Sequence, residues 1–288
     1  MKYGIIDVGS NSVRLLVCDE KTTYLKTNKI TRLSENMGDE LILKSEMVAR
    51  TVEAVSFFVN MAIDNKVDII KIFATAAVRL AKNQDYFLEQ VKLKTGFDVD
   101  VVSGELEASL GVNGALNGKD GAVIDIGGAS TELAVVNDGN IVYKKSINIG
   151  AVSLYSRFNE NLGQISAEIQ KQICQFKFDN SNILYGIGGT ITSLASIDLK
   201  LEPYDSNKIH GYCLTFDVVE KIVKSLSNMS LCEREKIVGL QKERAVSITS
   251  GALILYEIMK KFQISTITVS ESDNLEGYFN FIRGYNAK

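Results

Sequence analysis

Apolar and polar residues follow strand-like patterns at the start of the chain, and helical patterns come after them. Short apolar runs bounded by turn residues predict β-strands. These strands are expected over residues 2–8, 12–19, 22–30, 68–74 and 98–102. Apolar positions at helical spacing predict helices over residues 46–65, 84–95 and 104–116. The first half therefore has the order βββαβαβα.

The same plan begins again after a turn-rich stretch at residues 117–121. Strands are predicted over residues 121–126, 131–137, 140–148, 183–187 and 266–270. Helices are predicted over residues 151–158, 166–177, 190–198, 215–228 and 241–262, with one more at the end of the chain. We therefore predict two related α/β domains, residues 1–118 and 119–288, with the last helix packing back on the first domain.

Composition and charge narrow the class of protein. A hydrophobic content of 45% and a charged content of 23% are ordinary for a soluble globular protein. No apolar run approaches the roughly 20 residues of a membrane span, and Met1 leads directly into a strand, so we expect a cytoplasmic protein without membrane contact. A net charge of −3 argues against general nucleic-acid binding. Any polyanionic ligand must meet a local cluster of donors.

The cysteines indicate neither a metal site nor a disulfide framework. The chain has four cysteines far apart, no Cys-x-x-Cys pair and one histidine. We expect Cys18, Cys174, Cys213 and Cys232 to be small buried or half-buried side chains.

One short motif occurs twice, as Ile-Asp-Val-Gly-Ser-Asn-Ser at residues 6–12 and Ile-Asp-Ile-Gly-Gly-Ala-Ser at residues 124–130. Each copy stands between two apolar runs, which predicts a β-hairpin turn with exposed backbone N–H groups. Glycine suits such a turn because a side chain would block positive φ and keep ligand oxygens away from the backbone. Two turns of this kind facing each other would clamp linked phosphates.

The two copies differ in charge. Superposition pairs Asp7 with Asp125 and Arg14 with Glu132. The first half would then supply a cation for phosphate oxygens, and the second a carboxylate for a metal or a water. Asp7 and Asp125 end buried strands, where an unpaired carboxylate is costly, and this favours Mg²⁺. Alternatively, each aspartate caps its own turn.

Glu105 and Glu107 lie in the first turn of a predicted helix that directly follows a strand. Ligands of open α/β folds bind at the carboxyl ends of strands, which favours a catalytic role. The alternative is that acidic residues simply stabilise a helix N-terminus.

Three more segments are candidates for the same site. Arg79 follows a buried strand and suits phosphate oxygens, although a surface salt bridge is the alternative. The glycine-rich loop at residues 186–190 opens a helix, which is a suitable place for an anion. His210 has no Ser or Cys partner nearby in sequence, so a structural or substrate-orienting role is expected rather than acid–base catalysis.

Together these motifs resemble the exopolyphosphatase and guanosine pentaphosphate phosphohydrolase (Ppx/GppA) family over nearly the whole chain. The resemblance is carried by residues 6–12 with Arg14, 74–75 with Arg79, 103–108, 124–132 and 210–212. The family has the actin-like, sugar kinase and Hsp70 ATPase fold. The resemblance therefore implies an α/β protein with two RNase H-like domains around an interdomain cleft.

The resemblance also implies roles for individual residues. Glu107 would be the base that activates water, and Asp125 and Glu132 would join it in catalysis. Mg²⁺, or another divalent cation, would be held by Asp125, Glu132 and Asp7. The implied substrate-binding residues are Gly9, Ser10, Asn11, Ser12, Arg14, Arg79, Gly127, Gly128, Ala129, Ser130, Thr131, Gly188, Gly189 and Thr190.

The first functional hypothesis is a Mg²⁺-dependent exopolyphosphatase that releases orthophosphate from the end of inorganic polyphosphate. The alternative is 5′-phosphate hydrolysis of guanosine pentaphosphate, and a lower-ranked alternative is an actin-like ATPase or kinase, or a nucleotide-binding protein without turnover. A homodimer is the default assembly. The chain departs from the family pattern at Leu106, at Ala129 in place of a glycine, at Val246 in place of an aspartate, and at Leu275 in place of an arginine.

Overall fold

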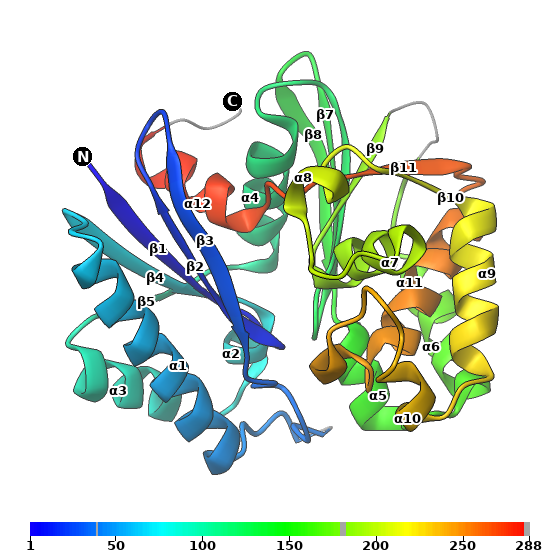
Figure 1. Ribbon diagram of the computed structural model, residues 1–288, viewed down its shortest axis with the longest axis horizontal. Coiled ribbons are helices and arrows are strands. Elements are labelled where there is room, and N and C mark those ends of the chain that lie inside the picture. The colour runs from blue at the N-terminus through cyan, green and yellow to red at the C-terminus, as the bar shows by residue number, and fades with distance from the viewer. Residues whose placement is uncertain (39, 179–182, 285–288) are drawn as a thin grey trace.

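The computed structural model describes residues 1–38, 40–178 and 183–284. Within them, two β-sheets stand next to each other, each with helices packed on it (Figure 1). None of the helices in these residues combines the length and the apolar composition that a membrane span requires.

The first sheet has the strand order β3-β2-β1-β4-β5. Its strands are β1 (Tyr3–Val8), β2 (Ser12–Cys18), β3 (Thr23–Ile30), β4 (Ile69–Ala74) and β5 (Val99–Val101). Strands β1 to β3 are antiparallel, whereas β4 and β5 run parallel to β1. The helices in the same part of the chain are α1 (Ser45–Asp64), α2 (Ala76–Leu80) and α3 (Gln84–Thr95). Helix α1 buries Phe58 and its apolar neighbours against β1 and β2, which forms one core.

The second sheet repeats this topology with the order β10-β11-β9-β6-β7-β8. Its strands are β6 (Gly121–Ile126), β7 (Thr131–Asn137), β8 (Asn140–Ile147), β9 (Leu184–Ile187), β10 (Cys213–Thr215) and β11 (Thr266–Val269). Around it lie α5 (Ala151–Phe158), α6 (Leu162–Ile173), α7 (Gly189–Leu199), α8 (Ser206–Ile209), α9 (Phe216–Ser227), α10 (Leu231–Arg234), the 3₁₀ turn η1 (Lys242–Arg244) and α11 (Ile248–Lys261). Both sheets have three antiparallel strands followed by two parallel ones, and the second sheet adds β10 at its edge, antiparallel to β11. This is the RNase H-like arrangement that the predicted fold class requires, and that fold class is confirmed.

Two helices connect the halves. Helix α4 (Gly104–Leu116) precedes the second sheet in sequence but packs on β6, β7 and β8. Helix α12 (Asn274–Ile282) comes last and packs on α4, β1 and β2, between the two sheets in Figure 1. The two helices approach so closely that a Cβ at Gly277 would overlap the backbone oxygen of Leu110. The sequence boundary at residue 118 thus separates the residues of the two sheets. Helix α4 comes before this boundary but packs on the second sheet, and α12 comes after it but packs on the first.

Several sequence predictions were wrong in detail. The helix expected over residues 241–262 begins at Ile248, because residues 242–244 form η1 and the chain turns there. The helix expected over 166–177 runs from Leu162 to Ile173. Cys18 is buried as predicted, but the other three cysteines are exposed. Cysteine is usually buried, but these three stand at surface positions of the fold. Cys174 ends α6, Cys213 lies in an edge strand, and Cys232 lies in the single turn α10.

Candidate active site

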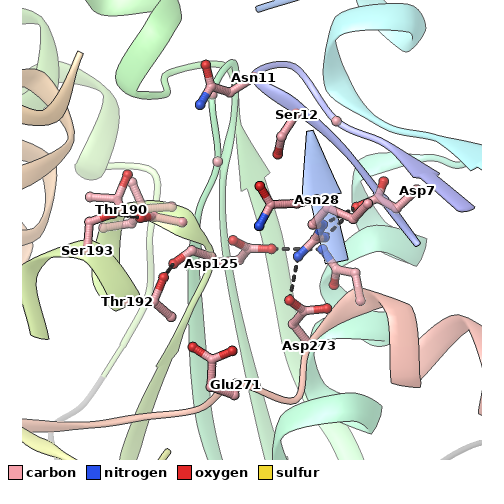
Figure 2. Close-up of a pocket in the computed structure, with 18 of the residues that line it drawn as sticks. Asp7, Asn11, Ser12, Asn28, Asp125, Thr190, Thr192, Ser193, Glu271 and Asp273 are labelled. Carbon is pink, nitrogen blue, oxygen red and sulfur yellow. Dashed lines mark hydrogen bonds and ion pairs between the residues drawn. The ribbon is translucent and has the colours of Figure 1, made fainter. Parts of the chain in front are cut away.

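A cavity of about 830 Å³ opens between the two sheets. Figure 2 shows side chains from both halves of the chain pointing into it. The sequence-predicted residues that line it are Asp7, Gly9, Ser10, Asn11, Ser12, Arg14, Glu107, Asp125, Gly127, Gly128, Ser130, Gly188, Gly189 and Thr190. Four other predicted residues, Arg79, Ala129, Thr131 and Glu132, lie behind this lining. The hydroxyl of Thr131 donates to the backbone oxygen of Ile149.

The two copies of the repeated motif have the same local structure. The strand register pairs Asp7 with Arg14 in the first hairpin and Asp125 with Glu132 in the second. Each turn is closed by the same backbone hydrogen bond, 3.0 Å long, from Gly9 to Ser12 and from Gly127 to Ser130. The turns also lie against each other, since a Cβ at Gly128 would stand 2.9 Å from the Cβ of Ser10. Their backbone N–H groups are therefore gathered at one place in the cavity.

Glycine is needed in these turns because other atoms lie close to its Cα, and not because φ is positive. This corrects the prediction of positive φ at these glycines. Neither Gly9, Gly127 nor Gly128 has a left-handed backbone. A Cβ at Gly9 would stand 3.0 Å from the oxygen of Ser12. Left-handed backbone occurs instead at Gly188, with φ of 88°, where a Cβ would also overlap the Asp125 carboxylate. Ala129 has no positive φ, so alanine fits its place in the second turn.

Arg14 is held by two carboxylates. Its Nε donates to Oδ2 of Asp7 at 2.8 Å, and its guanidinium also contacts Asp273 at the start of α12. Burial raises the pKa of Asp7 above its usual value, although Arg14 opposes this. Burial also acts to raise the pKa of Asp273, but the positive charges of Arg14 and Lys26 outweigh it and hold that pKa below its usual value. Arg14 therefore joins the two halves of the chain across the cavity.

Glu107 is a buried carboxylate at the cavity wall. It lies in the first turn of α4, whose N-cap Ser103 accepts a hydrogen bond from Leu106. Only 6% of Glu107 is exposed, and burial raises its pKa to about 7, against the effect of Arg79. Arg79 Nη1 donates to Glu107 Oε2 at 2.7 Å and to the backbone oxygen of Val102 at 2.9 Å. Arg79 thus lies behind Glu107, and Glu105 points away, with 73% of its side chain exposed.

Asp125 and Glu132 are neighbours across the second hairpin. Burial raises the pKa of Asp125 to about 6, while Arg14 lowers it. Oδ2 of Asp125 accepts from Nδ2 of Asn274 at 2.8 Å. Burial also raises the pKa of Glu132 well above its usual value, and the charges of Glu107 and Asp125 add to this. Glu132 Oε1 accepts from Ser146 at 2.6 Å, but its buried Oε2 has no hydrogen-bond partner among the described residues.

The carboxylates suit a divalent cation in chemistry and charge. Oxygens are the ligands that Mg²⁺ prefers, and two buried ones, Asp7 Oδ1 and Glu132 Oε2, lack partners among the described residues. No three acidic, His or Cys side chains converge as a preformed metal centre in that part of the chain. Mg²⁺ commonly uses one or two carboxylates together with phosphates and water, so Asp125 and Glu132 fit such a site. Asp7, the third predicted ligand, accepts hydrogen bonds from Arg14 through Oδ2, and its role as a ligand stays a prediction.

Several lining residues were missed by sequence reasoning. They are Lys26, Asn28, Thr192, Ser193, Tyr204, Glu271, Asp273 and Asn274. Arg244, which sequence analysis placed within a helix, also lines the cavity and packs directly over Gly189. One sequence signal was present: Asp273 and Glu276 form a capping box after a strand, which marks a helix start at the same sheet edge as the other motifs. His210 lies at the cavity too, and its Nδ1 accepts from the backbone of Glu271 at 3.3 Å.

Comparisons with known proteins agree with this arrangement. A model of the Ppx/GppA phosphatase family matches residues 17–280. A bifunctional 3-dehydroquinate synthase/phosphatase of Fusobacterium nucleatum is 32% identical over 303 residues, which covers 94% of this chain but 45% of that protein. The chain thus spans about half the length of this relative.

Solved structures cover the whole fold. A Ppx/GppA protein of Aquifex aeolicus is 28% identical with a TM-score of 0.80, covering 99% of this chain and 98% of its own. An exopolyphosphatase of Cytophaga hutchinsonii shares the fold, with a TM-score of 0.86, 24% identity, and coverage of 100% of this chain and 99% of its own.

Proposed function

This chain belongs to the Ppx/GppA phosphatase family, and from that membership we propose that it hydrolyses the terminal phosphoanhydride bond of inorganic polyphosphate and releases orthophosphate. The observation that carries the proposal is the place of Glu107, a buried carboxylate with a pKa of about 7 at a cavity into which two glycine turns expose their backbones. A base with a pKa near the operating pH is suited to take a proton from water.

The reaction follows from these parts. The turns around Gly9 and Gly127 donate backbone N–H groups to the oxygens of the terminal phosphate, and Arg14 adds a cation. Glu107 accepts a proton from a water molecule while the water oxygen bonds to the terminal phosphorus. The bond from that phosphorus to the bridging oxygen breaks, and the shortened chain leaves with the electron pair. Glu107 then returns its proton to solvent.

A divalent cation fits beside Asp125 and Glu132. When bound, Mg²⁺ supplies positive charge that offsets the charge of the phosphates and of the carboxylates. The contribution of the chain itself is to keep both side chains buried and fixed, Asp125 by Asn274 and Glu132 by Ser146.

A second candidate substrate is guanosine pentaphosphate, cleaved at its 5′-terminal phosphate. It is favoured by one part of the cavity, where α7, the loop before α8 and α8 itself present uncharged hydrogen-bonding side chains. These are Thr190, Thr192, Ser193, Tyr204 and Asn207. Such groups suit a nucleoside better than a further phosphate.

The test compares the wild type with Glu107→Gln and Glu105→Gln. Each is incubated with polyphosphate, guanosine pentaphosphate and ATP, with and without Mg²⁺, and released phosphate is measured. We expect Mg²⁺-dependent release by the wild type and by Glu105→Gln, whose site in the same helix turn is exposed, and a loss of about 10²- to 10⁴-fold in Glu107→Gln. Preferential turnover of ATP, or wild-type activity of Glu107→Gln, would overturn the proposal.

A further inference from the structure

The cavity contains more acidic than basic side chains. Among the residues that the structure describes, three cationic side chains line it, Arg14, Lys26 and Arg244. Six carboxylates line it, Asp7, Glu107, Asp125, Glu271, Asp273 and Glu276. Six against three leaves a formal excess of three negative charges. This is an unusual lining for a site whose substrate is itself a polyanion.

Most of the positive charge is already engaged. Arg14 is paired with Asp7 and Asp273. Lys26 Nζ lies 2.8 Å from Glu276 Oε1 and 3.7 Å from Asp273 Oδ1. Arg244 donates to Gln241 Oε1 at 3.0 Å and makes no ion pair with a carboxylate of the described residues. Apart from the turns that receive the terminal phosphate, Arg244 is therefore the one cation of the described cavity lining that has no ion-pair partner and can meet the rest of the substrate.

Two of the carboxylates come from one loop, and one of them, Glu271, lies away from the phosphate turns. Glu271 and Asp273 belong to the connection between β11 and α12, and in Figure 2 Glu271 lies at the opposite end of the view from Asn11 and Ser12. Glu271 accepts a hydrogen bond from the hydroxyl of Tyr204, and Lys26 Nζ donates to its backbone oxygen, but no cation of the described residues forms an ion pair with its carboxylate. A long chain of phosphates that left the cavity on this side would place charged units beside these two carboxylates. Like charges at such distances oppose binding, and each added phosphate would add to the repulsion.

We propose that Glu271 and Asp273 are specificity-determining residues that restrict this site to short phosphoanhydrides and disfavour long polyphosphate chains. The inference rests on the proposed function, because it concerns the length of the substrate whose terminal bond is cleaved. The terminal phosphate occupies the two turns, and Arg244 accommodates the charge next to it. Uncharged Thr192, Ser193 and Asn207 line the remaining space, which suits a substrate that ends there.

The test measures kcat/KM, per chain end, for tripolyphosphate and for a polyphosphate long enough to extend out of the cavity. The proteins are the wild type, Glu271→Gln, Asp273→Asn and the control Asp98→Asn. Asp98 is exposed and outside the cavity, so its variant removes the same charge without touching the site. Asn at position 273 still caps α12. Glu271 makes no contact with Arg14, so its variant tests the charge even if Asp273→Asn proves unstable.

We expect the wild type and Asp98→Asn to favour tripolyphosphate by about tenfold or more, and each acidic-site variant to reduce that ratio severalfold. The wild-type preference should also weaken as salt is raised. Equal use of both lengths by the wild type, or an unchanged ratio in Glu271→Gln, would overturn this inference and leave the proposed function standing. If neither substrate releases phosphate, both this inference and the proposed function are overturned.

Discussion

The ion pair between Arg79 and Glu107 should set the pH at which the protein becomes active. Glu107 acts as a base only when ionised, so activity rises with pH through its pKa, which is about 7. Arg79 lowers that pKa through its charge and its hydrogen bond, against the larger effect of burial. Arg79→Gln removes the opposing charge, whereas burial and the nearby charges of Asp125 and Asp7 remain. The pKa of Glu107 must then rise.

The size of the shift follows from the contact. A cation at hydrogen-bond distance lowers a carboxyl pKa by about 1 to 3 units, so its loss should move the acid limb from about 7 to about 8 to 10. At neutral pH the ionised fraction of Glu107 would fall by about 5- to 500-fold, and it would recover at alkaline pH. Recovery is the informative part, because a merely misfolded variant would stay inactive at every pH.

The assay is a pH profile of kcat/KM for phosphate release at saturating Mg²⁺. Arg79→Lys is the matched control, since it keeps the charge and should leave the limb within about one unit of the wild type. An acid limb that stays in place or moves to lower pH in Arg79→Gln would refute the assignment of Glu107 as the base.

Three further predictions concern helix packing, stability and binding. Gly277→Ala should lower the melting temperature and the activity, because the overlap with Leu110 costs roughly 1 to 3 kcal/mol against a helix-propensity gain of about 1 kcal/mol. The control is Gly163→Ala in α6, where the nearest atom to the new Cβ is 3.6 Å away, and it should be neutral or stabilising. Equal effects at both sites would contradict the packing argument. With a chelator present, the free energy of unfolding should fall as pH rises from about 5 to 8. The raised folded-state pKa values of Glu107 and Asp125 give stability that is present below their unfolded pKa values and is lost as pH rises through about 6 to 7. Mg²⁺ should raise the melting temperature more at the higher pH, and a flat pH profile with an equal Mg²⁺ effect at both pH values would argue against the buried carboxylates as the Mg²⁺ site. Arg244→Met should raise KM by about 10- to 100-fold with little change in kcat, whereas an unchanged KM would exclude Arg244 from substrate binding.

Local patterns in the sequence were sufficient to predict two related α/β halves, whereas the RNase H-like fold was implied by the family resemblance. The repeated Asp-x-Gly turn and the apolar runs around it predicted two hairpins with one register, and the structure has Asp7 opposite Arg14 and Asp125 opposite Glu132. The parallel strands β4 and β9 were also predicted from their apolar runs, whereas the short elements α2, α8, α10 and β10 were not predicted. The predicted features depend on neighbours in the chain, which is why a single sequence reveals them.

The other half of the cavity was not predictable in this way. Arg14 meets Asp273 across 259 positions of the chain, and Asp125 meets Asn274 across 149. Nothing near Asp273 distinguishes it from an ordinary helix cap, because its contact with Arg14 exists only after α12 has packed against α4. Arg244 was hidden for a different reason: its segment has helix-forming residues, but the packed structure turns it toward Gly189.

The central claim, that water activated by Glu107 attacks the terminal phosphate, can be tested most directly with isotopic oxygen. Wild-type protein is allowed to cleave tripolyphosphate in oxygen-18-labelled water, and the released orthophosphate and the remaining diphosphate are analysed by mass spectrometry. The account predicts one labelled oxygen from solvent in the orthophosphate, none in the diphosphate, and loss of the labelled product in Glu107→Gln. Label in the diphosphate, or the same labelled product at the same rate from Glu107→Gln, would contradict it.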